Sequence, residues 1–144
     1  EACLVGSEMC IRDSLSIAFS IERYQEFLDD FPESKLNDAA VKSIEILRGK
    51  LGKKIYETGI LYMKLDEFES AKMTFQSVID VYYDTEIIQL AYQGMVEALA
   101  RNKEIDEAKS LLSEHENVLV KSGLYDDAAK TIEKMQKTIL KASN

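Results

Sequence analysis

The sequence predicts an all-α fold made of helical hairpins stacked one after another. Apolar residues recur at helical spacing along nearly all of the 144 residues, and one proline and six glycines interrupt them only sparsely. The small residues Gly59 and Ala71 stand where two antiparallel helices must approach each other closely. The apolar side chains expected between those helices are Ile55, Tyr62, Phe68, Phe75 and Val78.

This spacing is typical of the tetratricopeptide repeat, a helix-turn-helix unit of about 34 residues. We therefore expect an all-α, tetratricopeptide-like helical hairpin solenoid of about six helices. One hairpin cannot cover its own apolar face, so such units stack on their neighbours and present an extended surface. That architecture favours the holding of partners over catalysis.

The first fourteen residues differ in origin from the rest of the chain by our interpretation. The run from Cys3 to Ser14 resembles a translated transposase-type sequencing adapter, so we exclude residues 1–14 as non-native. The alternative is a natural N-terminal segment. The rest, residues 15–144, is expected to be one repeat domain and a fragment of a longer protein.

Charge and cysteine content exclude several classes of function. Both cysteines, Cys3 and Cys10, lie in the excluded segment, so the rest can build no disulfide or thiolate zinc site. Glu1, Glu8, Asp13 and Arg12 together carry −2, so the net charge of −8 becomes −6 without them. An acidic chain does not suit nucleic acid. No apolar run is long enough to span a bilayer.

The helices are expected in the following order. A first helix with Ile17, Tyr24, Phe27 and Leu28 on one face ends before Phe31 and Pro32, because proline cannot continue a helix. Its face with Ile17, Phe19 and Tyr24 is expected to be under-packed. Ser34 caps a second helix, which runs to about Leu65, with Gly49 and Gly52 as a weak point or bend.

Four more helices complete the pattern. The third is expected from about Glu67 to Tyr82, and the fourth carries Ala91, Met95, Ala98 and Leu99. The fifth runs from Asp106 to about Val120, and a turn at Gly123 leads into the sixth, which carries Tyr125 and Ile132. Internal comparison indicates a degenerate array, in which the small residue opening the second helix of each unit is Ser20, Ala71, Ala108 and Ala128 in turn.

An ordered series of motifs resembles one family. Residues 18–119 are similar to the BamD/YfiO-type lipoproteins of the bacterial outer-membrane β-barrel assembly machinery. Tyr83 replaces the proline usual in the family before Asp84 and Thr85. By the resemblance, we expect this chain to be the C-terminal portion of a longer protein, whose N-terminal half carries the signal peptide and acylated cysteine. The motifs carrying the resemblance are Tyr24–Leu28, Phe31–Ser34, Asp38–Ala40, Leu47–Leu51, Tyr56 with Gly59, Tyr62–Leu65, Phe68–Ala71 and Val78–Thr85.

The resemblance implies a non-catalytic scaffold subunit at the periplasmic face of the outer membrane, docking on the periplasmic domains of the barrel subunit beside other assembly lipoproteins. It implies membrane association only through a missing N-terminal lipid anchor or through partners. The candidate contacts are exposed residues of two segments and a pair of tyrosines. For the basic residues among them, a helix face that contacts only water is the simpler interpretation. They are Arg48, Lys50, Lys53, Lys54, Lys64, Glu67, Glu69, Tyr82 and Tyr83.

No constellation of residues indicates an enzyme, a cofactor or a metal. His115 is the only histidine, and its neighbours Glu114 and Glu116 suggest a hydrated helix surface. The carboxylate pairs, such as Asp29 with Asp30, suit helix ends. The alternative function is a general tetratricopeptide adaptor that grips a peptide or protein partner in its concave groove.

Overall fold

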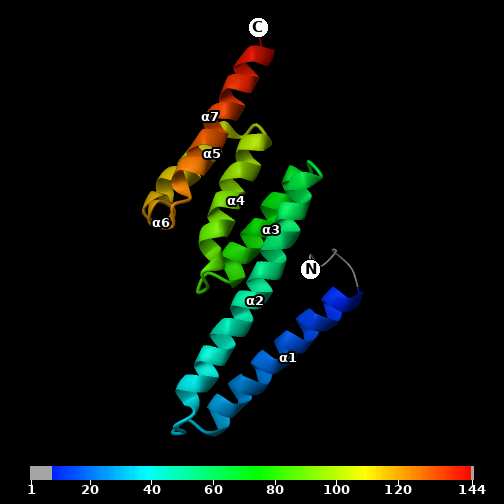
Figure 1. The fold of residues 1–144 in the computed structure, drawn as a ribbon, viewed down its shortest axis with the longest axis vertical. Coiled ribbons are helices and arrows are strands. Elements are labelled where there is room, and N and C mark those ends of the chain that lie inside the picture. The colour runs from blue at the N-terminus through cyan, green and yellow to red at the C-terminus, as the bar shows by residue number, and fades with distance from the viewer. Residues whose placement is uncertain (1–7, 144) are drawn as a thin grey trace. The chain divides into compact units, whose positions relative to one another are not determined.

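The computed structural model describes residues 8–143 and divides the chain into two compact units, Glu1–Lys54 and Ile55–Asn144 (Figure 1). Every regular element among the described residues is a helix, which confirms the expected all-α, tetratricopeptide-like class. The helices are α1 (Glu8–Asp30), α2 (Asn37–Lys64), α3 (Phe68–Val81), α4 (Ile87–Arg101), α5 (Ile105–Glu114), α6 (Glu116–Lys121) and α7 (Tyr125–Ala142).

The first unit consists of α1 and the part of α2 up to Lys54. Ser34 accepts a hydrogen bond from the N–H of Leu36, so it caps the turn that leads into α2, while the helix itself begins three residues later than Ser34, at Asn37. No break occurs at the expected weak point, because α2 continues through Gly49 and Gly52. Residues 1–7, half of the suspected adapter, lie outside the described residues, and residues 8–14 begin α1.

Little apolar surface is buried in the first unit. Among its described residues, Ala40 is the only buried apolar side chain. Leu15 and Phe19 on α1 are 65% and 57% exposed, and Tyr24 is 38% exposed, whereas Ile17 is half-buried. The prediction of an under-packed α1 face is confirmed for Phe19 and Tyr24.

The core of the second unit is centred on Phe75 of α3, whose side chain is completely buried. A Cβ atom added to Gly59 of α2 would lie 2.6 Å from the Phe75 ring, and one added to Gly94 of α4 would lie 2.7 Å from it. Real Cβ contacts are not this short, so both glycines are required for the ring to fit between the two helices. The expected role of Gly59 is confirmed, whereas Gly94 was not foreseen.

Helix α4 is the central element of this unit, packing against α3 on one side and against α5, α6 and α7 on the other. Its small residues permit this, since Ala91, Ala98 and Ala100 are fully buried and bring neighbouring backbones close. Leu112, Leu119 and Ile132 complete the core from α5, α6 and α7.

The turns from α2 to α3, from α4 to α5 and from α6 to α7 share one backbone conformation. Each contains a residue with positive φ: Asp66 at 59°, Lys103 at 69° and Gly123 at 73°. The N–H of that residue donates to the carbonyl three residues earlier, and the next N–H donates to the carbonyl five residues earlier. This is the Schellman motif, which ends a helix by satisfying its last carbonyls.

The same register places an alanine five residues beyond each left-handed residue. Ala71, Ala108 and Ala128 are all fully buried, and each donates its N–H to the carbonyl four residues earlier. The predicted repeat is therefore confirmed for these three. It is wrong for Ser20, because α1 runs unbroken from Glu8 and Ser20 opens no helix.

The expected fifth helix is divided into α5 and α6, which makes seven helices among the described residues instead of six. The division falls at His115, where φ is −106° and ψ is 19°. The His115 ring stacks on Tyr92 of α4 with centroids 3.7 Å apart. The prediction of a hydrated surface for His115 is wrong, because its half-buried ring packs against α4.

The shared turn geometry predicts opposite effects of substitution at two of its positions. Lys103→Gly should raise the free energy of unfolding by about 0.5–1 kcal/mol, because glycine adopts positive φ without the Cβ penalty. Gly123→Ala, the matched reverse change, should lower it by about 1 kcal/mol. Urea denaturation of both variants measures this, and a destabilised Lys103→Gly would show that the turn conformation is misassigned.

Candidate protein-binding site

The sequence-predicted contact residues fall in both units. In the first unit, Lys50 and Lys53 of α2 are exposed, whereas Arg48 and Lys54 are half-buried. The Nζ atom of Lys54 lies 3.7 Å from the Asp13 carboxylate, an ion pair within the same unit. Lys50 and Lys53 are thus the more accessible of the four basic residues.

In the second unit, the candidates lie around α3. Lys64 and Glu67 are exposed at the turn before the helix, Glu69 is exposed in its first turn, and Tyr83, just after its end, is 68% exposed. Tyr82 was expected to be exposed, and this is wrong because only 9% of its surface is accessible. It ends α3, donating its N–H to Val78 while its carbonyl accepts from Thr85, and this tight turn holds it against the protein.

A polar cluster joins the N-terminal part of α3 to the turn before α5. Lys72 of α3 contacts Glu104 at 2.7 Å and Glu69 at 2.9 Å, and its side chain is only 17% exposed. The amide nitrogen of Asn102 donates to Glu69 at 2.7 Å and also to Glu104. Two consecutive hairpins are therefore tied together by charged hydrogen bonds as well as by apolar packing.

The ionisation of this cluster reflects its geometry. The hydrogen bond from Lys72 lowers the pKa of Glu104, against the opposing effect of burial. Burial alone would lower the pKa of Lys72, but its bonds to Glu104 and Glu69 outweigh burial and raise it. Both groups are thus held in their charged forms at neutral pH.

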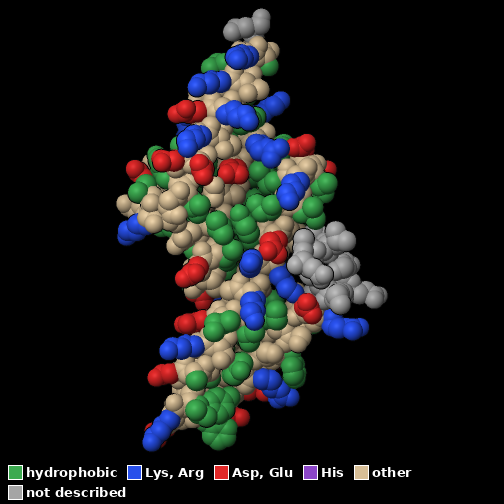
Figure 2. Space-filling model, in the orientation of Figure 1, with side chains coloured by type: hydrophobic (Ala, Val, Ile, Leu, Met, Phe, Trp, Pro, Cys, Tyr) green, Lys and Arg blue, Asp and Glu red, His purple; other side chains and the backbone are tan. Residues whose placement is uncertain are grey.

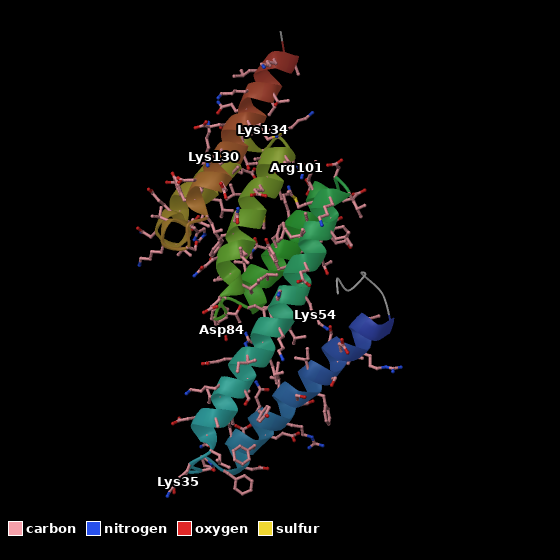
Figure 3. All side chains as sticks on the ribbon, viewed as in Figure 1. Lys35, Lys54, Asp84, Arg101, Lys130 and Lys134 are labelled. Atoms are coloured by element: carbon pink, nitrogen blue, oxygen red, sulfur yellow. The ribbon has the colours of Figure 1, made fainter. Side chains whose placement is uncertain are left out.

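Arg101, at the end of α4, makes a second link to the turn after α2 (Figure 3). Its guanidinium donates to the Asp66 carboxylate at 2.8 Å and to the carbonyl of Met63 at 3.3 Å. It also lies 4.8 Å from the centroid of the Phe68 ring, within cation–π range. Contacts from the adjacent hairpin therefore hold Asp66 in its positive-φ backbone conformation.

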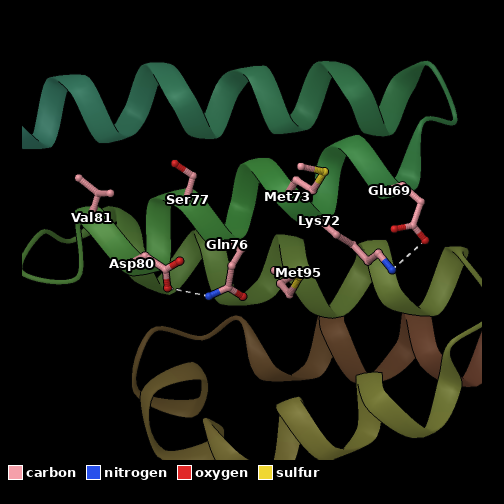
Figure 4. Close-up of a pocket in the computed structure, with 8 residues that line it drawn as sticks. All are labelled: Glu69, Lys72, Met73, Gln76, Ser77, Asp80, Val81 and Met95. Atoms are coloured by element: carbon pink, nitrogen blue, oxygen red, sulfur yellow. Dashed lines mark hydrogen bonds and ion pairs between the residues drawn. The ribbon is translucent and has the colours of Figure 1, made fainter.

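An open groove of about 510 Å³ runs along α3 in the second unit (Figure 4). We call it the α3 groove. Exposed apolar atoms come from Met73, 75% exposed, and Val81, 48% exposed, and the largely buried Met95 contributes from α4. The groove is lined by Glu69, Lys72, Met73, Gln76, Ser77, Asp80, Val81 and Met95.

The chemistry of the α3 groove suits protein contact. Gln76 donates to Asp80 at 2.8 Å and Lys72 pairs with Glu69, so the polar groups are already oriented by one another. Met73 is flexible and polarizable and adapts to an apolar partner. Of the predicted contact residues, only Glu69 lines the groove, and sequence reasoning missed Lys72, Met73 and Met95.

Among the described residues, no group of three or more histidine, cysteine, aspartate or glutamate side chains is arranged to hold a metal ion. Nor does any described helix combine the length and the apolar character that crossing a membrane requires.

Comparison with protein families gives a match over residues 4–119 to the YfiO family, described as outer membrane lipoprotein. The chain belongs to the YfiO family. The match covers all of α2, α3, α4 and α5, so the α3 groove and the polar cluster lie within the family region. Helix α7 lies outside it. No curated protein was found to match the chain.

The lowered pKa of Glu104 predicts a pH-dependent contribution to stability. Glu104→Gln should reduce the free energy of unfolding at pH 7 by on the order of 1 kcal/mol, since it removes the charge that Lys72 contacts. The difference from the wild type should shrink as pH falls through the pKa of folded Glu104, because the wild-type carboxylate is then protonated.

Chemical denaturation at pH 7 and near pH 3 measures this difference. Glu133→Gln on the exposed face of α7 removes one carboxylate without touching the cluster and serves as the control. A Glu104→Gln deficit that stayed constant between the two pH values would contradict the assignment.

Proposed function

We propose that this chain is a non-catalytic scaffold subunit of the machinery that assembles β-barrel proteins in the outer membrane, docking on the periplasmic domains of the barrel subunit. Membership of the YfiO family carries this proposal. The stacked hairpins support it, because a unit fixed by apolar packing and by charged ties between turns presents a rigid surface to a folded partner.

The proposed docking surface is the α3 groove together with the exposed residues at the two ends of α3. Lys64, Glu67 and Glu69 lie at one end and Tyr83 at the other. The groove adds the exposed apolar atoms of Met73 and Val81, which give a partner area to bury. Lys50 and Lys53 of the first unit stay as a separate proposed contact.

In the full-length protein, we propose that a lipid anchor preceding residue 15 holds the chain at the periplasmic face of the outer membrane, beside other assembly lipoproteins. The description of the family as an outer membrane lipoprotein supports this. We also propose that residues 1–14 are non-native, although the family match begins at residue 4. The genomic sequence upstream of residue 15 tests both statements.

The docking proposal predicts the effect of a charge placed in the groove. Met73→Asp should weaken binding of the barrel subunit's periplasmic domains at least about tenfold, because it buries an unpaired carboxylate against the partner. Met73 is 75% exposed, so the fold should tolerate the change. The measurement is titration of the 144-residue chain with the isolated periplasmic domains.

Val120→Asp on α6 is the matched control, since Val120 is also apolar and exposed, at 55%, but lies outside the groove. Equal affinities for the two variants would place the docking surface elsewhere. If the chain bound short peptides and no folded periplasmic domain, the general adaptor function would replace the scaffold function.

A further inference from the structure

Helix α7 carries four lysines on one face: Lys130, Lys134, Lys137 and Lys141, which we call the lysine stripe. At 3.6 residues per turn, their spacing places them within about 60° of one another around the helix. All four are exposed. On the opposite face Ala128 and Ile132 are buried and Met135 packs on the core, so the lysine stripe is directed away from the protein.

The lysine stripe reverses the charge of the rest of the chain. Residues 130–144 contain four lysines and one acidic residue, Glu133, a local charge of +3. Because the whole chain carries −8, the remaining residues 1–129 carry −11. Figure 2 shows several basic side chains gathered toward the C-terminal end of α7, beyond a band of acidic ones. Such segregation of charge marks an interaction surface.

Internal ion pairs do not account for the stripe. Lys130 lies 3.5 Å from the Asp127 carboxylate, and both side chains are well exposed. Within the described part of the chain, Lys134, Lys137 and Lys141 form no ion pair. Their three ammonium groups are therefore available to an external anion.

The end of α7 also offers an apolar side chain. Residues 136–143 include no buried residue, and Figure 1 shows these last turns of α7 extending past the helices that it packs against. Leu140 is 59% exposed and stands one turn from Lys137, at i, i+3. Lysines beside an exposed leucine form the pattern of a helix that meets an interface between water and lipid.

We propose that the lysine stripe, with Leu140, binds the surface of a membrane that carries anionic phospholipids. Lysine is a hydrated point charge on a flexible stem, which suits phosphate groups without fixed positions. A protein surface rich in carboxylates favours arginine, whose planar group binds them in a bidentate manner, and α7 has no arginine. The chain belongs to an outer membrane lipoprotein family, so a phospholipid surface is nearby.

This contact goes beyond the proposed docking on the barrel subunit and does not rest on it. It also adds to the membrane association expected from the sequence, which relied on an anchor or on partners alone. The matched family region ends at residue 119, so the stripe is a feature of this chain outside that region.

Vesicle binding by the 144-residue chain tests the proposal. We expect it to cosediment with vesicles containing one third phosphatidylglycerol and not with phosphatidylcholine alone. Each lysine near an anionic surface contributes about fivefold in affinity, so the triple variant K134Q/K137Q/K141Q should bind on the order of 100-fold more weakly. Raising the salt from about 0.15 M to about 1 M should have a similar effect, because the screening length falls to about 3 Å.

The matched control is K35Q/K42Q/K109Q, which removes the same charge from three exposed lysines elsewhere. It should bind nearly as the wild type does. An equal loss of vesicle affinity in both triple variants would overturn the proposal. Failure of the wild type to bind anionic vesicles would also overturn it. If the wild type bound soluble polyglutamate but not vesicles, and this binding required the lysine stripe, the stripe would be assigned to an acidic protein instead.

A fluorescent probe distinguishes insertion into the lipid from electrostatic attraction at a distance. The chain contains no tryptophan, so Leu140→Trp reports on one position only. Its emission should shift to the blue with anionic vesicles and stay unchanged with phosphatidylcholine, because the ring then leaves water. Emission that shifts with neither vesicle would overturn the assignment of Leu140 to the contact.

Discussion

The ring of Phe75 contacts two helices at once because each of them presents a glycine to it. Gly59 of α2 and Gly94 of α4 leave room that any Cβ atom would occupy, and the Tyr56 ring lies 5.6 Å from the Phe75 ring, centroid to centroid. Burial of one such aromatic contributes about 1.5–3 kcal/mol. Helix α4, which the ring contacts at Gly94, also packs on α5 and α7, so the ring lies at the start of the packing that continues into the following helices.

The turns and their charged contacts then hold the hairpins in the positions that the core allows. Three Schellman motifs end α2, α4 and α6 in the same way, and the alanines that follow let each next helix approach closely. Lys72 of α3 pairs with Glu104 in the turn before α5, and Arg101 of α4 pairs with Asp66 in the turn after α2. The outcome is a unit in which α3 presents its groove on a fixed frame, while the lysine stripe of α7 faces away from the core.

Local patterns in the sequence predicted α3, α4, α7 and the role of Gly59, because apolar periodicity and a small residue opposite an aromatic are visible within one hairpin. Gly94 was missed, since it lies inside a helix and its partner is on another one. The Lys72–Glu104 pair joins residues 32 positions apart, and His115, where the helix divides, stacks on a ring from α4. Such features depend on tertiary contacts that no local pattern contains.

Space for the Phe75 ring, and no other property of the two glycines, sets the packing of this unit. A double-mutant cycle tests it: Gly94→Ala is measured in the wild type and in a Phe75→Leu background, with Gly49→Ala, which has open space around it, as the control. We predict that Gly94→Ala costs about 1–3 kcal/mol in the wild type. In the leucine background the cost should fall by at least about 1 kcal/mol, and strictly additive effects would show that the two glycines act through something other than space for the ring.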